Sequence, residues 1–165
     1  MKIYEAVKME IEQEAKSTRR MLERVPDDKL DWRPHEKSMT LGSLASHLAE
    51  IPSWLEPTVT QDELDIPEGF KAWAASNTKE LVAKFDENMK LALKSLEKAD
   101  ESAIMNMWAL KFGGKQMMQL PRLVVLRNFV TNHLVHHRAQ LGVYLRLLGV
   151  PVPSVYGPSA DEQVQ

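Results

Sequence analysis

One stretch decides the fold that this sequence predicts: Asn132-His133-Leu134-Val135-His136-His137-Arg138-Ala139-Gln140. It lies in the middle of a run that begins near Pro121 and stops at Gly149. Proline suits the first turn of a helix, where the N–H that it lacks would be unpaired, and glycine suits the position just after the last turn. Pro151 then prevents the helix from resuming. We therefore predict one long helix between Pro121 and Gly149.

The histidines of this helix differ in the direction they face. With a turn of ~100° per residue, His133 and His137 fall inside the apolar stripe that also holds Leu141 and Tyr144. His136 lies roughly 90° from the centre of that stripe, on its flank. Two imidazoles four residues apart have Cβ atoms about 5–6 Å from each other, close enough to share one metal ion. From this pair alone, two core histidines that each hydrogen-bond a neighbouring helix explain the pattern equally well.

Apolar residues recur at helical spacing in three further segments. These are residues 3–25, the segment from Thr40 to Leu55, and the segment from Asn77 to Leu96. Thr40 and Asn77 are suitable N-caps for the second and third of them. Because each apolar stripe must be covered by another element, the sequence predicts an all-α fold, a four-helix bundle. We expect residues 1–165 to form a single domain.

The connections between these helices are of three kinds. Residues 57–70 are polar and rich in proline, which predicts a long crossover loop, either a lid or a plain connection. Residues 108–118 alternate in polarity around Gly113-Gly114, which predicts a small hairpin before the last helix. Residues 150–165 have the composition of an irregular tail that packs back or frays.

Composition and charge exclude several classes of function. The 165 residues include no cysteine, so thiolate metal sites, cysteine nucleophiles and disulfides are excluded. The net charge of −2 lacks the basic footprint of a nucleic-acid-binding protein. No segment has the ~18 uninterrupted apolar residues of a membrane span, and the N-terminus has no apolar signal core. We therefore expect a soluble, cytoplasmic protein that binds neither nucleic acid nor membrane.

A third histidine is predicted to face the same core. His47 lies one turn after Leu44 and one turn before Ile51 on the second helix. Three neutral imidazoles with a fourth position left open are the ligand set of a catalytic zinc site, and they also suit nickel. Burying three unconnected imidazoles would instead require three separate hydrogen-bonding solutions, so the metal interpretation is favoured. His35 follows a proline in a charged loop, and we interpret it as a solvated surface residue.

The sequence resembles the DinB-like family, whose members are metal-binding four-helix bundles related to bacterial transferases of low-molecular-weight thiols. The resemblance rests on Leu30-Asp31-Trp32-Arg33-Pro34, Leu44-Ala45-Ser46-His47-Leu48-Ala49, Asn132 to Leu141, Tyr144-Leu145-Arg146, Pro151-Val152-Pro153 and Tyr156-Gly157-Pro158. It implies a divalent metal ion, commonly zinc or nickel, held by the residues that match His47, His133 and His137. It also implies that the protein is a homodimer. Many members carry an acidic residue where this chain has Ser43, so no role of that carboxylate is carried over.

The resemblance points to an enzyme acting on a small-molecule substrate. The thiol-transferase relatives imply that a low-molecular-weight thiol is a co-substrate and is added to a small electrophile. A metal-dependent hydrolase would use the same ligands with water as nucleophile. His136 and Gln140 flank the ligands and are candidates for orienting them.

A non-enzymatic alternative is a binding or stress-response module stabilised by its metal. A fourth protein ligand, such as Asp161 from the tail, would close the metal site and favour this alternative. A serine hydrolase built on Ser46-His47 or Ser159 is disfavoured, because the sequence lacks a Gly-x-Ser-x-Gly elbow.

Overall fold

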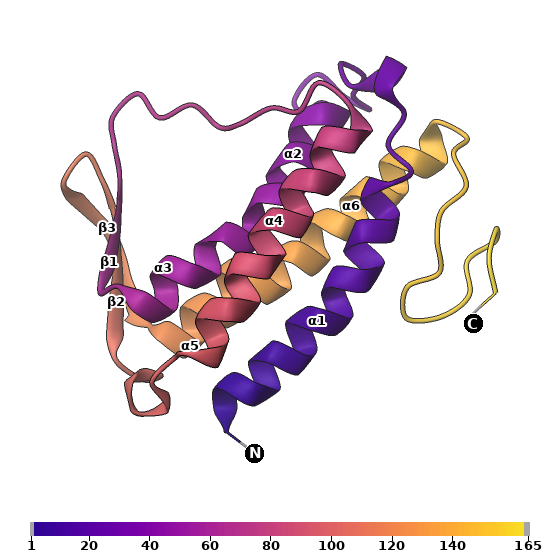
Figure 1. Cartoon of the computed structure of the whole chain (residues 1–165). Helices are drawn as coiled ribbons and strands as arrows, with labels where there is room; N and C mark the ends of the chain where they lie inside the picture. Colours follow the sequence, from indigo (N-terminus) through magenta and orange to yellow (C-terminus); the bar gives the residue numbers. More distant parts are fainter. Residues whose placement is uncertain (1, 164–165) are drawn as a thin grey trace.

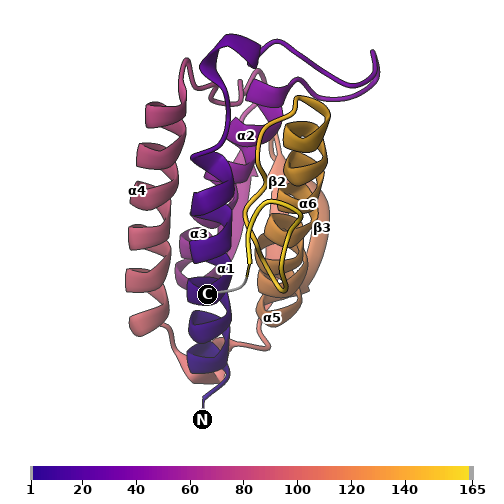
Figure 2. The same ribbon diagram turned by 90° about the vertical axis from the view of Figure 1, so that its right-hand side faces the viewer.

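The computed structural model describes residues 2–163. Its body is a bundle of four helices: α1 (Ile3–Leu22), α2 (Leu41–Glu50), α4 (Thr78–Glu97) and α6 (Asn132–Leu147) (Figure 1). Helices α4 and α6 each pack against both α1 and α2. Figure 2 shows α4, α1 and α6 running side by side, so the four predicted helices are confirmed as the body of the protein.

The bundle core is made of the predicted apolar stripes. Ile11 of α1, Leu44 of α2, Phe85 of α4 and Leu141 of α6 are all buried in one cluster. The two predicted N-caps also form, because the side chain of Thr40 accepts the Ser43 N–H and that of Asn77 accepts the Glu80 N–H. Burial of a large aliphatic or aromatic side chain contributes roughly 1.5–3 kcal/mol, so this cluster is the main source of the fold's stability.

The long last helix is built from three consecutive pieces. They are α5 (Arg122–Val125), a π-helical segment (Leu126–Thr131) and α6. Pro121 directly precedes the first turn, and Gly149 ends the helix with a φ of 72°. The predicted limits are therefore confirmed. The π-helical turns, which carry about one extra residue, were not visible in the sequence pattern.

The all-α prediction was wrong, because the protein contains a three-stranded mixed sheet. Its strands are β1 (Glu63–Ile66), β2 (Met107–Phe112) and β3 (Lys115–Pro121), in the order β1-β2-β3. Strands β2 and β3 form the predicted hairpin, whereas β1 pairs with β2 in parallel. The sequence pattern predicts that these residues belong to a loop. Its four residues form a strand only because β2, more than forty positions later, supplies hydrogen-bonding partners.

The region after α2 also differs from a plain loop. Pro52 lies where α2 gives way to a 3-10 turn, which is followed by the short helix α3 (Leu55–Thr60). The predicted crossover loop thus contains most of α3 and all of β1, and only the segment after Pro67 crosses back to α4 without regular structure. The 3-10 turns of the described chain are Asp27–Lys29, Ile51–Trp54 and Glu101–Ala103.

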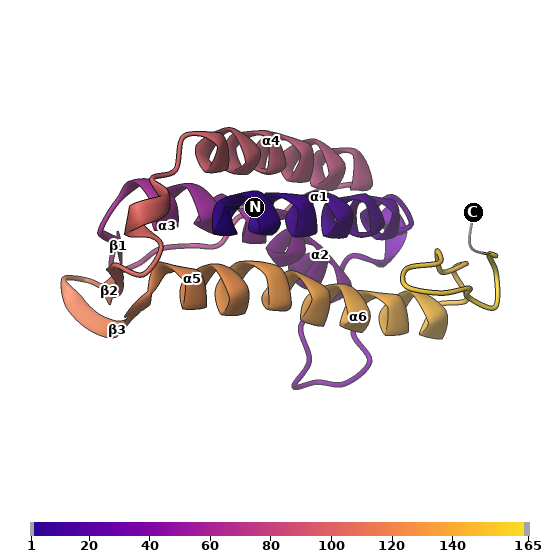
Figure 3. The ribbon, with the colours of Figure 1, turned by 90° about the horizontal axis from the view of Figure 1, so that it is seen from below.

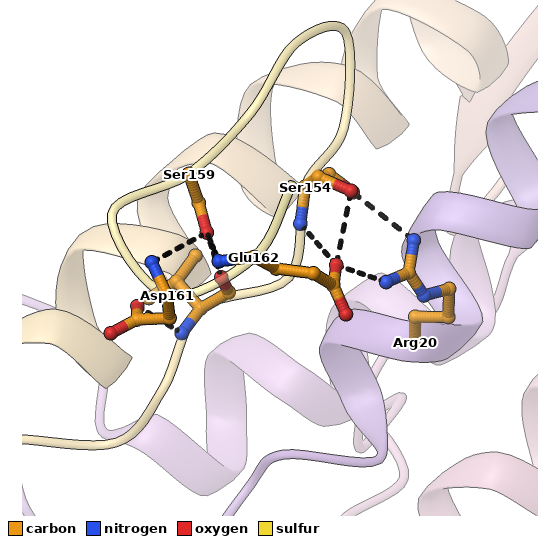
Figure 4. Close-up of polar contacts among 6 residues, drawn as sticks. Arg20, Ser154, Ser159, Asp161 and Glu162 are labelled. Carbon is orange, nitrogen blue, oxygen red and sulfur yellow. Dashed lines mark hydrogen bonds and ion pairs between the residues drawn. The ribbon is translucent and has the colours of Figure 1, made fainter. Parts of the chain in front are cut away.

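The sheet and the C-terminal tail lie on opposite sides of the bundle (Figures 1 and 3). Of the two predicted behaviours of the tail, packing back and fraying, the structure shows the first. Figure 4 shows the contacts of the tail. The Glu162 carboxylate accepts hydrogen bonds from the Ser154 N–H (2.7 Å) and hydroxyl (3.0 Å), and it pairs with Arg20 of α1. The Ser159 hydroxyl accepts the N–H groups of Asp161 (3.1 Å) and Glu162 (3.0 Å).

Residues 1 and 164–165 of the predicted domain and tail lie outside the described residues. Within residues 2–163, no helix combines the length and the apolar character needed to cross a membrane.

Candidate metal centre

Three histidines from two packed helices converge on one point. His47 projects from α2, and His133 and His137 project from α6. The Nε2 atom of His133 lies 3.2 Å from that of His47 and 2.8 Å from that of His137. One potential ligand atom from each ring lies within 4.8 Å of the others. The structure therefore brings together the three residues that the sequence singled out as metal ligands.

Hydrogen bonds on the far side of two rings decide which nitrogen carries the proton. Nδ1 of His133 lies 3.3 Å from the carbonyl oxygen of Phe129, and Nδ1 of His137 lies 2.7 Å from Oε1 of Gln140. Both oxygens can only accept a hydrogen bond, so each Nδ1 is assigned the proton and each Nε2 a lone pair. The two Nε2 lone pairs thus face each other at close range.

Facing lone pairs are the arrangement that a metal ion satisfies. Two such nitrogens at 2.8 Å repel each other unless a cation lies between them. Two imidazoles bound to a tetrahedral ion at about 2.0–2.1 Å would have nitrogen atoms roughly 3.3 Å apart. The observed separations of 2.8 Å and 3.2 Å are close to that value, so the three residues fit a divalent ion.

The electrostatic environment keeps all three rings neutral. Burial lowers the pKa of His47 to about 4, with a smaller contribution from the nearby His133 and His137 rings. Burial is also the main cause that lowers the pKa values of His133 and His137. Metal binding requires deprotonated ligands, so near pH 7 a metal ion would not compete with protons for these nitrogens.

Asp161, the tail residue considered as a fourth ligand, is engaged elsewhere. The Asp161 carboxylate accepts the Val152 N–H at 2.9 Å and pairs with Arg146. Within residues 2–163, the only cluster of three or more potential ligands contains His47, His133 and His137 alone. Three protein ligands with an open position are typical of catalytic rather than structural zinc sites.

The other residues singled out from the sequence have different surroundings. Gln140 contacts His137 directly and holds its ring, as described above. The side chain of His136 is exposed, and its ring centroid lies 4.9 Å from that of His137. His35 is exposed and accepts the Lys37 N–H, which agrees with its interpretation as a surface residue.

Two serines near His47 are engaged in the fold. Ser46 is buried, and its hydroxyl accepts the N–H of Ala75 at 3.0 Å, so it is not available as a nucleophile. Ser43 accepts a hydrogen bond from the Thr40 hydroxyl at 2.8 Å, which makes it part of the N-cap of α2.

A cleft opens beside His47. It has a volume of about 480 Å³ and lies between the α2–α3 region and the segment that begins with β1. Glu50 and Trp54 line it together with His47, and the indole of Trp54 stacks on Phe129, with ring centroids 6.3 Å apart. Sequence reasoning missed both residues. The spacing of three between His47 and Glu50 placed them on one helix face, a signal that could have found Glu50.

The fold and the site together define a helical bundle with a small sheet and a three-histidine candidate metal centre. The protein belongs to the DinB family, whose family model matches residues 5–164. The resemblance noted from the sequence is therefore confirmed. No significant match was found among curated proteins.

Crystal structures of three proteins share this fold. A DinB-like protein from Bacillus cereus is 25% identical, with a TM-score of 0.71 over 92% of this chain and 97% of its own. A DinB-like protein from Bacillus subtilis is 14% identical, with a TM-score of 0.69 over 97% and 99% of the two chains. A proposed member of the family from Exiguobacterium sibiricum is 20% identical, with a TM-score of 0.64 over 92% and 95%.

Proposed function

We propose that this protein is a metal-dependent enzyme that binds one divalent ion, zinc or nickel, through His47, His133 and His137 and acts on a small molecule. The observation that carries the proposal is the convergence of three Nε2 atoms, of which those of His133 and His137 have lone pairs that face each other. They form an incomplete ligand sphere, and His47 also borders a cleft large enough for a small substrate.

The reaction that we propose is the transfer of a low-molecular-weight thiol to a small electrophile. A divalent ion held by the three histidines would supply the positive charge that favours the deprotonated form of a thiol or water at the open position. The thiol loses its proton to solvent or a nearby base, and its sulfur forms a bond to the electrophilic carbon. At the same time that carbon's bond to a leaving group breaks and the group departs with the electron pair, or, where the electrophile is an alkene or epoxide, its C=C π bond or C–O bond breaks and the resulting anion takes up a proton from solvent. Gln140 and the Phe129 carbonyl fix the tautomers of His137 and His133, which keeps both Nε2 atoms directed at the site.

Metal-dependent hydrolysis is the second candidate, and the position of Glu50 favours it. Glu50 lines the same cleft as His47, and burial raises the pKa of its carboxyl group. A carboxylate with a raised pKa is suited to accept a proton from an attacking water. The two candidates therefore share their ligands and differ in the nucleophile.

The test begins with metal content and then separates the two reactions. Elemental analysis of the purified protein should find about one divalent ion per chain, and His133→Ala should lose it. The metal-loaded protein is then incubated with a panel of electrophiles, with and without each bacterial thiol. Thiol-dependent consumption supports the transferase, and thiol-independent consumption supports the hydrolase. A full metal content without turnover would favour the non-enzymatic binding module.

The homodimer stays a prediction that rests on the family resemblance. Size-exclusion chromatography with light scattering would test it, since a dimer has twice the mass of the 18.8 kDa chain.

A further inference from the structure

The cleft beside His47 has a largely apolar wall. Trp54 follows α2, Leu64 and Ile66 come from β1, and Phe70 belongs to the segment that follows. Phe70 is 58% exposed, although a phenyl ring gains free energy when it is covered. An apolar group of a ligand that enters the cleft would cover this surface.

The charges on the cleft are all of one sign. Glu50, Glu56 and Asp65 line it, and no Lys or Arg side chain within residues 2–163 does so. These carboxylates come from different elements, so the fold gathers them around one opening. A cleft lined by one sign of charge raises the local concentration of oppositely charged ligands and repels those of like charge.

Neighbouring groups do not neutralise two of these carboxylates. Asp65 accepts the Gly114 N–H, with oxygen atoms at 3.0 Å and 3.1 Å from the nitrogen. Glu56 accepts the Thr60 hydroxyl at 3.2 Å. Both donors are uncharged, and Lys111, the β2 residue in register with Asp65, pairs with Glu63 at 2.6 Å. The negative charges of Asp65 and Glu56 are therefore retained at the cleft.

The third carboxylate has one cation in its neighbourhood. Lys84 of α4 is the basic residue whose charge acts on Glu50. The Lys84 ammonium donates to Glu87 at 3.1 Å, so its charge is shared with a second carboxylate. The balance of charge around the opening therefore stays negative.

We infer that this cleft binds the electrophilic substrate, and that this substrate has an apolar body with an ammonium or uncharged polar group rather than a carboxylate or phosphate. The inference rests on the proposed function, since it treats the cleft as the substrate-binding part of the same site. The apolar body lies against Trp54, Leu64 and Ile66, and the polar or cationic group lies near Glu56 and Asp65.

Three small probes of similar size and different charge test this inference. They are 2-phenylethylamine, 2-phenylethanol and 3-phenylpropionate. Their dissociation constants are measured by NMR titration of wild-type protein stripped of metal with a chelator, because a bound cation would itself attract the carboxylate. The amine is expected to bind at least about tenfold more tightly than the carboxylate, with the alcohol between them. The largest shifts are expected at Trp54, Leu64 and Ile66.

Variants that remove negative charges test whether the preference for the amine over the carboxylate arises in the cleft. The double variant Glu56→Gln/Asp65→Asn is expected to reduce the preference for the amine to about twofold or less. The control Asp31→Asn/Glu36→Gln removes the same number of charges from exposed positions that do not line the cleft, and it should keep the preference. Circular dichroism verifies that each variant is folded.

The outcomes separate this inference from the proposed function. Equal or tighter binding of the carboxylate to the stripped protein, or an equal loss of preference in the control, would overturn the inference. Such a result would leave metal content and turnover unaffected. Conversely, the protein could lack metal or turnover and still prefer the amine. That result would refute the proposed enzymatic function but support the charge preference of the cleft.

Discussion

His137 and Arg138 are adjacent on α6, and each belongs to a polar cluster of a different kind. Arg138 is 2% exposed; it donates to the Glu14 carbonyl (3.1 Å) and to the Tyr156 hydroxyl (2.7 Å), and it pairs with the Glu14 carboxylate (2.7 Å). In this cluster each charge faces its opposite. At His137 two lone pairs face each other instead. The contrast indicates that the arginine cluster is complete and structural, whereas the histidine cluster could hold a metal ion.

The strongest test of this contrast is the removal of Arg138. In Arg138→Ala the Glu14 carboxylate stays buried without its partner, so we expect the free energy of unfolding to fall by about 3–5 kcal/mol. Urea denaturation followed by circular dichroism measures this loss. The matched control is Arg146→Ala, whose pair with Asp161 is exposed and should contribute within about 1 kcal/mol. Equal losses in the two variants would contradict a structural role specific to the arginine cluster.

Removal of the metal should cause the next largest loss of stability, and this loss should depend on the histidine cluster. Zinc at a free concentration of about 100 times its Kd stabilises the folded state by about 2.7 kcal/mol. We therefore expect a chelator to lower the melting temperature of the wild type, as measured by calorimetry. His133→Leu removes a ligand, so its melting temperature should not respond to zinc or chelator. A zinc response in this variant as large as that of the wild type would refute the ligand assignment.

A smaller effect is expected from the residue that orients His137. Gln140→Ala removes the acceptor of the Nδ1 proton, so metal affinity should fall by roughly 10–100-fold. Competition with a chromogenic chelator measures this change. Because Gln140 is exposed, the stability of the metal-free protein should change by no more than about 0.5 kcal/mol. His136→Ala is the control, and an equal loss of affinity there would show that Gln140 has no special role.

The smallest effect is expected where the tail is docked, in a third cluster that resembles that of Arg138. Hydrogen bonds from Ser154 and the ion pair with Arg20 lower the pKa of Glu162 from its ordinary 4.5 to about 2. The contribution of Glu162 to stability should therefore be complete above pH 4.5 and decline as the pH falls toward 2.

The pH dependence of the urea midpoint between pH 6 and pH 2.5 measures this contribution. The difference between wild type and Glu162→Gln should shrink over that range, because the glutamine cannot titrate. A difference that stays constant with pH would contradict the role of the Glu162 charge.

Local patterns in the sequence were sufficient to predict the four main helices of the bundle and the inward direction of three histidines. His133 and His137 lie four positions apart on one helix, and a helical wheel places both on the inner face. His47 is placed inside by its spacing from Leu44 and Ile51. The hairpin was predictable for the same reason, since Gly113-Gly114 separates two alternating runs.

Features that depend on distant partners were not predictable. Strand β1 is stabilised by parallel pairing with β2, which no local signal announces. Arg138 lies 124 positions from the Glu14 carbonyl that it contacts, so its burial could not be inferred from its neighbours in sequence. The acidic cleft combines residues of α2, α3 and β1. A prediction that places residues 57–70 in a loop gives no basis for expecting it.

The π-helical segment Leu126–Thr131 changes the direction in which the side chains after it face, relative to the side chains before it. A π-turn holds about one residue more than an α-turn, so it offsets everything that follows by roughly 100°. On one side of it α5 packs against β2, β3 and α3, and on the other side α6 packs against α1 and α2. In a regular α-helix with one residue fewer, the side chains of α6 would be turned by roughly 100° relative to those of α5. The additional residue therefore sets the rotation of α6 relative to α5 about the helix axis. With this rotation His133 and His137 face His47 while α5 keeps its contacts with the sheet.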